Sequence, residues 1–82
     1  MAGYVNIKYF ALLREKTGLS EERFPIDSDE TGITLYRKLC EKYDFPLTLD
    51  QVMLVVNENY ASKDSTLEEN DCVVFIPPVA GG

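Results

Sequence analysis

The 82-residue sequence contains no histidine, which excludes a Ser-His-Asp triad, a Cys-His pair and a histidine-ligated metal. Cysteine is also scarce. Cys40 and Cys72 lie far apart and form no CxxC pair, which argues against a zinc site, an iron–sulfur cluster or a redox dithiol. We expect both to be reduced thiols packed in the core. If the protein takes part in chemistry, we expect that its side chains do not perform it.

Long apolar runs and clustered positive charge are absent too. The first residues show no basic segment followed by a long apolar one, and the apolar stretches are only strand-sized. We therefore expect neither a signal peptide nor a transmembrane helix, and a cytoplasmic protein that does not bind membranes. Eight Lys and Arg are scattered among 14 Asp and Glu, giving a net charge of −6. This balance argues against nucleic acid as a partner and favours a basic protein surface.

What the sequence does contain is typical of one small globular domain. Hydrophobic residues make up 45% of the chain, and four Phe and five Tyr supply bulk for a core. A chain of this length buries roughly 60 to 65% of the surface that its unfolded form exposes. We expect a domain over residues 1–76 and a flexible tail over residues 77–82, without internal repeats or linkers.

Hydrophobic periodicity predicts the elements of the first half. Apolar and polar residues alternate over residues 4–10, as in a half-buried strand. A short helix should follow and end at Gly18, and Pro25 confines the segment around residues 20–26 to an edge strand or a strand end. Leu35, Leu39 and Tyr43 recur at helical spacing, with Tyr36 and Cys40 beside them, which predicts the main helix near residues 32–43. Its candidate N-terminal caps are Thr31 and Asp29.

Further strands are predicted in the second half. The continuous apolar run "QVMLVVN" indicates a strand covered on both faces. The segment "NENY" predicts a tight turn into a short strand at residues 60–61, and a last strand should span residues 72–76. This order predicts an α+β fold of the ubiquitin-like β-grasp type. We expect a mixed sheet of about five strands, one main helix and one short helix, with the first and last strands side by side at the centre.

The sequence ends on "FIPPVAGG", in which Gly81 and Gly82 add little to the stability of a fold. Pro77 and Pro78 favour an extended backbone. Six extended residues reach on the order of 20 Å, so the tail could enter the active site of a partner.

The segments "YFALLREKTG", "VVNENY" and "LEENDCVVFIPPVAGG" resemble the MoaD-like sulfur carriers, the small subunits of molybdopterin synthase. The resemblance spans nearly the whole chain. It implies that an ATP-dependent, E1-like adenylyltransferase and sulfurtransferase converts the Gly82 carboxylate to a glycyl-adenylate and then to a thiocarboxylate (1-thioglycine). The sulfur would then pass to a pterin precursor in the large subunit and form the dithiolene of molybdopterin, in molybdenum cofactor biosynthesis.

The resemblance also implies roles for particular residues. Gly82 is the expected reacting group, with Gly81 next to it, in a heterotetramer with the large subunit. No metal or bound cofactor is expected, and the isolated chain should be inactive. Arg14 could contact a partner, but we favour a solvated helix charge as its role. The expected contacts to the large subunit, for which ordinary packing is the alternative, are Phe10, Tyr60, Phe75, Ile76, Pro77, Pro78 and Val79.

Three other functions remain open. A sulfur carrier of the thiamine pathway would share the fold, although such carriers are usually shorter and lack the two prolines before the tail. A protein modifier would be joined through Gly82 to lysines of other proteins, as ubiquitin is. A pure binding module would have an inert tail, and removal of Gly81 and Gly82 would change nothing.

Overall fold

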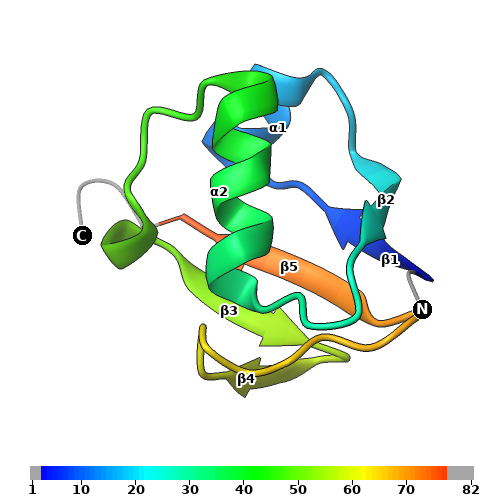
Figure 1. The fold of residues 1–82 in the computed structure, drawn as a ribbon. Helices are drawn as coiled ribbons and strands as arrows, with labels where there is room; N and C mark the ends of the chain where they lie inside the picture. The colour runs from blue at the N-terminus through cyan, green and yellow to red at the C-terminus, as the bar shows by residue number, and fades with distance from the viewer. Residues whose placement is uncertain (1–2, 78–82) are drawn as a thin grey trace.

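The computed structural model describes residues 3–77, which form a β-sheet with one long helix lying across it (Figure 1). In chain order the elements are β1 (Gly3–Lys8), α1 (Ala11–Thr17), β2 (Glu21–Ile26), α2 (Gly32–Tyr43), the short 3₁₀-helix η1 (Leu49–Gln51), β3 (Met53–Val56), β4 (Asn59–Ala61) and β5 (Cys72–Ile76).

The described strands form one mixed five-stranded sheet in the order β2-β1-β5-β3-β4. The first and last strands lie together at its centre and run parallel, with Asn6 opposite Cys72 and Lys8 opposite Val74. β2 and β4 are the edge strands, and both pair antiparallel with their neighbours. The α+β β-grasp architecture and the central position of the terminal strands are therefore confirmed.

The core lies between the sheet and α2, which crosses one face of the sheet (Figure 1). Because side chains alternate along a strand, every second residue of the central strands points to that helix. In β5 these are Val73 and Phe75, which are completely buried, and in β3 they are the buried Leu54 and the partly buried Val56. The other fully buried core residues are Val5, Ile7, Tyr9, Leu13, Leu35, Tyr36, Leu39 and Val52.

The main helix has the predicted bounds because both of its ends are capped. The Thr31 hydroxyl accepts the N–H of Thr34 at 3.3 Å, and the Thr34 hydroxyl accepts the N–H of Thr31 at 3.0 Å. This reciprocal capping box satisfies donors that the first turn leaves unpaired. At the other end Asp44 adopts the left-handed conformation, with φ of 55°, and its N–H bonds to the carbonyl of Cys40. Of the two predicted caps, the structure selects Thr31.

Several details differ from the sequence-based prediction. β1 ends at Lys8 rather than at residue 10, because the N–H of Tyr9 bonds to the Ser20 carbonyl and Phe10 becomes the N-cap of α1. β2 begins at Glu21, one residue later than expected. The helix η1 was not predicted, although the Thr48 and Gln51 pair at its ends forms a capping box.

The prediction that β3 is covered on both faces is wrong. α2 covers the side of the sheet to which Leu54 points, whereas Met53 on the opposite side is 53% exposed. We call this opposite side the open face. No helix within the described residues is long and apolar enough to cross a membrane.

The two cysteines are free thiols, but the prediction that both belong to the core is only partly right. Both are half-buried. Cys40 packs against the core from α2, and burial raises the pKa of its thiol. Cys72 lies instead on the open face, next to Asn6 in the register of β1 and β5.

Candidate functional site

The predicted reacting group lies outside the described residues, together with Pro78, Val79 and Gly81. Pro77 is the last residue described. It is half-buried and directly follows Ile76, the final residue of β5. The part of the site that the structure defines is therefore the surface around the end of β5, from which the tail continues.

Strand register gathers apolar side chains on the open face near the end of β5. Ile76 lies opposite Met53, and Val74 lies opposite Val55. Val55 in turn lies opposite Tyr60 on β4. Directly paired residues on neighbouring strands point to the same face, so these side chains form adjacent rows.

Phe10 extends the row that contains Ile76. Lys8 pairs with Val74 at the end of the parallel register of β1 and β5, and if that register is extended by two residues, Phe10 falls level with Ile76. Tyr9 is buried and Phe10 is 51% exposed, as expected if alternation continues one step past the strand. We define the tail-base patch as Phe10, Met53, Val55, Tyr60, Val74 and Ile76.

The tail-base patch exposes several apolar side chains, and the exposed Lys8 lies at its margin opposite Val74. Tyr60 is 71% exposed, and Phe10 and Met53 are each about half exposed. Single exposed apolar residues are common, but contiguous groups of them on a small domain mark sites of protein association. Aromatic residues and methionine are enriched in such interfaces. The patch is therefore suited to bind another protein while the tail continues from its edge.

The structure brings together three of the predicted contact residues and separates a fourth. Phe10, Tyr60 and Ile76 share the tail-base patch. Phe75 is fully buried, and its ring centre lies 5.0 Å from that of Tyr36 in the core. Its side chain therefore supports the patch from beneath, and we correct the expectation that it forms part of a contact surface. Arg14 is exposed in the last turn of α1.

Sequence reasoning missed Met53, Val55 and Val74. The signal was present in the apolar run of β3, which was interpreted as burial on both sides. One main helix can cover only one face of a five-stranded sheet. A strand that is apolar throughout in such a two-layer fold must expose apolar side chains on its other face, and these are candidates for an interface.

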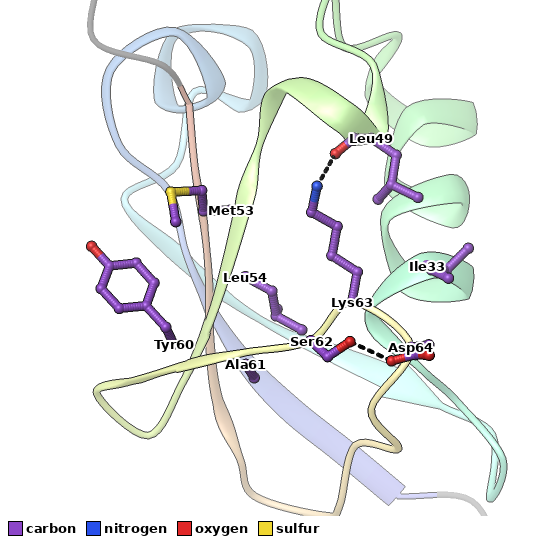
Figure 2. Close-up of a pocket in the computed structure, with 9 residues that line it drawn as sticks. All are labelled: Ile33, Leu49, Met53, Leu54, Tyr60, Ala61, Ser62, Lys63 and Asp64. Carbon is purple, nitrogen blue, oxygen red and sulfur yellow. Dashed lines mark hydrogen bonds between the residues drawn. The ribbon is translucent and has the colours of Figure 1, made fainter.

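An open groove adjoins the tail-base patch at the fork between β3 and the end of β4, with a volume of about 510 Å³. Figure 2 shows the Lys63 side chain extending along it, with its Nζ donating to the Leu49 carbonyl at 2.6 Å. Met53 and Tyr60 lie on its patch side. The remaining lining residues are Ile33, Leu49, Leu54, Ala61, Ser62, Lys63 and Asp64.

Buried polar groups lie away from the patch and stabilise the fold. The hydroxyls of Tyr9 and Tyr43 each donate to Glu22 Oε1 at 2.7 Å. Burial, followed by the adjacent Glu22 carboxylate, raises the pKa of both tyrosines, so they remain protonated donors. No group of three or more potential metal-binding side chains occurs within residues 3–77.

Glu30 is the one buried charged residue among those described, and it is 2% exposed. It accepts the Asp27 N–H at 3.1 Å, the Lys38 ammonium at 2.6 Å and the Thr34 hydroxyl. Burial disfavours the charged form of Glu30. The hydrogen bonds outweigh burial and hold the pKa of this carboxyl below its ordinary value. The carboxylate therefore ties the β2–α2 loop to the helix.

The sheet order, the single crossing helix and the patch beside the last strand define a ubiquitin-like β-grasp protein. Two solved structures from Haloferax volcanii share this fold. The HVO 2177 protein superposes with a TM-score of 0.85 at 27% identity, over 99% of this chain and 88% of its own. The small archaeal modifier protein SAMP1 superposes with a TM-score of 0.79 at 26% identity, over 98% of this chain and all of its own.

The particular family follows from the sequence. The chain belongs to the ThiS family, whose model matches residues 7–82. The molybdopterin synthase sulfur carrier subunit of Dictyostelium discoideum is 35% identical over the full length of both chains. The subunit of that name from Aedes aegypti is 30% identical, over 95% of this chain and 88% of its own. The resemblance to these carriers is confirmed.

Proposed function

We propose that this protein is the sulfur-carrying subunit of a molybdopterin synthase. The main support is the 35% identity to the Dictyostelium discoideum sulfur carrier subunit, which extends from end to end of both chains. The tail-base patch adds a physical reason, because it provides a binding surface directly beside the segment that would carry the sulfur.

The chemistry takes place at the Gly82 carboxylate. An E1-like enzyme transfers the adenylyl group of ATP to this carboxylate and releases pyrophosphate. The acyl-adenylate has a good leaving group, so a sulfur nucleophile displaces AMP and leaves a thiocarboxylate. Glycine suits this position because it has no side chain to hinder attack on its carbonyl or passage through a narrow channel. Each thiocarboxylate donates one sulfur to a pterin precursor, and hydrolysis of the acyl group returns Gly82 to its carboxylate, so two loaded carriers supply the two sulfurs of the molybdopterin dithiolene.

The folded domain positions this reactive end by binding to the partner. The tail-base patch docks on the large subunit, and docking confines the tail to the neighbourhood of the partner's active site. Tethering raises the effective concentration of the sulfur without new chemistry. A complex of subunits 1 and 2 of the molybdopterin-converting factor from Helicobacter pylori has a TM-score of 0.56 and 20% identity to this chain. It supports the expectation that a protein of this fold can assemble with a second subunit.

The test is a variant that carries one additional residue after Gly82. We expect it to form neither thiocarboxylate nor molybdopterin dithiolene, because the reactive carboxyl carbon is displaced. Stability should change by less than about 0.5 kcal/mol, since the addition lies beyond the last strand. Mass spectrometry of the intact protein reports the state of the terminus, and melting temperature and large-subunit binding serve as controls. Normal dithiolene formation by the unprocessed extended chain would contradict the proposal.

A second candidate is a protein modifier, favoured by the similarity to the small archaeal modifier protein SAMP1. In this case the activated Gly82 would form an isopeptide bond with a lysine of another protein. The same mass spectrometry on protein from its own host separates the two functions. A thioacid terminus supports the sulfur carrier, whereas branched lysine peptides that contain the C-terminal glycines support the modifier. The ThiS family match also allows a carrier of the thiamine pathway, which would bind a different acceptor enzyme.

A further inference from the structure

Strand β4 presents unpaired backbone groups at the edge of the sheet. β3 and β4 are joined by a two-residue turn, Asn57 and Glu58, both with positive φ, of 51° and 71°. These angles are typical of a type I′ hairpin, in which the closing pair, here Val56 and Asn59, exchanges both hydrogen bonds. The next pair, Val55 and Tyr60, is then a non-hydrogen-bonded pair. The N–H and C=O of Tyr60 therefore point away from β3.

No strand within residues 3–77 pairs with that side of β4, which is the last strand in the sheet order. β2, at the opposite edge, contains Pro25, which has no N–H to donate. Native proteins usually protect an open strand edge with charge, a bulge or a covering segment. β4 has an aromatic residue at its centre, and Tyr60 is 71% exposed.

The groove lies beside this edge and can receive an apolar side chain. It opens at the fork where β4 leaves β3, and Leu49, Leu54 and Ala61 contribute apolar surface to it (Figure 2). The hydrocarbon part of Lys63 extends along it, and its ammonium is held at the Leu49 carbonyl. An extended strand directs alternate side chains to opposite faces, so a strand added to β4 places one set towards the groove and the other beside Tyr60.

The charges around the edge indicate which segment fits. Glu58 precedes β4, and Lys63 and Asp64 follow it. The Lys63 ammonium is held at the Leu49 carbonyl, whereas Asp64 accepts the Ser62 hydroxyl. The chain as a whole carries a net charge of −6, so a second copy would be repelled. A segment of opposite charge would be attracted to the edge and held in one orientation.

We propose that the β4 edge is a second protein-binding site, which accepts an extended segment of a partner protein. The segment has apolar residues at alternate positions and a basic residue at each end. It pairs with the N–H and C=O of Tyr60, its apolar side chains occupy the groove, and its basic ends lie near Glu58 and Asp64. This mode of binding is β-strand addition. It goes beyond the proposed sulfur transfer, which requires the open face and the tail.

The probe is an acetylated and amidated peptide, Arg-Val-Thr-Val-Thr-Val-Arg, titrated into the ¹⁵N-labelled full chain. We expect saturable binding, with the largest amide shift changes at residues 58–64 and slowed hydrogen exchange of the Tyr60 amide. A peptide with Glu at both ends should bind at least tenfold more weakly. Equal affinity of the two peptides, or shift changes confined to the tail-base patch, would overturn the proposal.

Backbone pairing is tested in the peptide, so that folding of the protein is not affected. Two N-methylated versions are compared, each with the methyl groups on one of the two alternating sets of amides. Only one edge of an added strand faces β4, so one version should retain its affinity and the other should lose at least tenfold. Equal affinities would show that backbone pairing is absent.

The contribution of charge is tested with Glu58→Gln combined with Asp64→Asn. The matched control combines Glu15→Gln with Glu41→Gln, which changes the net charge equally at exposed helical positions. We expect peptide affinity to fall about fivefold in the first variant and to remain unchanged in the second at low salt, as weak surface charge pairs allow. Equal losses in both would contradict the proposed contacts. Neither experiment involves Gly82, so their failure would not affect the proposed function.

Discussion

The two faces of the sheet are built from the same strands, but they have different surroundings. Val73 and Phe75 of β5 point towards α2 and are fully buried, whereas Val74 and Ile76 point to the open face and are only half-buried. Their residue types are similar. What differs is the second layer, which α2 provides on one side only (Figure 1).

Because of this difference, alternate residues of a single strand contribute either to the stability of the fold or to binding. Full burial of a large apolar side chain contributes about 1.5–3 kcal/mol to folding, and the covered face has already gained that free energy. Side chains on the open face are only partly buried, so a partner that covers them gains the remaining free energy of burial. Substitutions on the two faces should therefore affect different measurements.

The largest effect is expected for Phe75→Ala on the covered face. Removal of a fully buried phenylalanine leaves a cavity in the core, and the free energy of unfolding should fall by about 3–5 kcal/mol. Ile76→Ala, one residue further along the strand, is the matched change on the open face and should cost much less. Urea unfolding of both variants measures the difference. A larger loss for Ile76→Ala would contradict the assignment of the two faces.

The second largest loss of stability is expected for Glu30→Gln, which removes the buried charge on the covered side. Loss of a charge-assisted hydrogen bond to Lys38 should lower the free energy of unfolding by about 2 kcal/mol at pH 7. The folded-state pKa of Glu30 is lowered, so its contribution is present above the unfolded pKa of about 4.3 and is lost as the pH falls through the folded pKa.

This sign predicts how stability responds to acid. The difference between wild type and Glu30→Gln should be constant near neutral pH and should shrink as the pH falls below about 4. Urea unfolding at a series of pH values measures it. Asp29→Asn, at an exposed neighbouring position, serves as the control. A difference that grows towards low pH would refute the role assigned to Glu30.

A smaller effect is expected for Tyr43→Phe at the margin of the core. It removes one of the two hydroxyls that donate to Glu22, while Tyr9 continues to donate. The loss of one such bond should cost about 1 kcal/mol. Thermal unfolding compares it with Tyr4→Phe, whose side chain is 48% exposed. An equal change in melting temperature for both would show that the Glu22 contact does not stabilise the fold.

The smallest effects on stability are expected on the open face, where binding should change instead. Phe10→Ala and Tyr60→Ala should each alter the free energy of unfolding by less than about 0.5 kcal/mol. Buried aromatic anchors commonly cost about 2 kcal/mol of binding free energy when truncated, so affinity for the large subunit should fall by more than tenfold.

Tyr4→Ala is the matched control for these two variants, because Tyr4 is an exposed aromatic at the far end of the same face of β1. Calorimetric titration with the large subunit should give wild-type affinity for it. If Tyr4→Ala weakens binding as much as Tyr60→Ala, the interface is not centred on the tail-base patch.

Local sequence signals determined most of the fold. The bounds of α2 were predictable because a stripe of apolar residues, a Thr cap and a following Pro46 all agree. β1 was predicted too long because apolar alternation continues through Tyr9 and Phe10, although the pairing with β5 ends at Lys8 and the extended Phe10 is the N-cap of α1. Periodicity describes side chains, whereas the end of a strand depends on which backbone groups find partners.

The candidate site was only partly predictable for a similar reason. Resemblance to the family indicated Phe10, Tyr60 and Ile76, and the structure gathers them on one surface. The resemblance could not indicate that Phe75 is buried, because burial of Phe75 depends on which face of β5 meets α2. Alternation predicts that Val73 and Phe75 lie on the same face of β5. It does not predict which face of the sheet the helix covers, because this depends on the three-dimensional arrangement.

The parallel pairing of β1 with β5 has a consequence for biosynthesis. Each of these strands has the other as a neighbour, yet they are separated by almost the entire chain. Contacts between such distant segments form slowly and close the largest possible loop. A ribosome that has produced only the first 70 residues has made both edge strands and α2, but it has not yet made the strand that joins the two halves of the sheet. Complete folding therefore requires Cys72–Ile76, and a chain that ends before this segment lacks the strand that connects the two halves of the sheet.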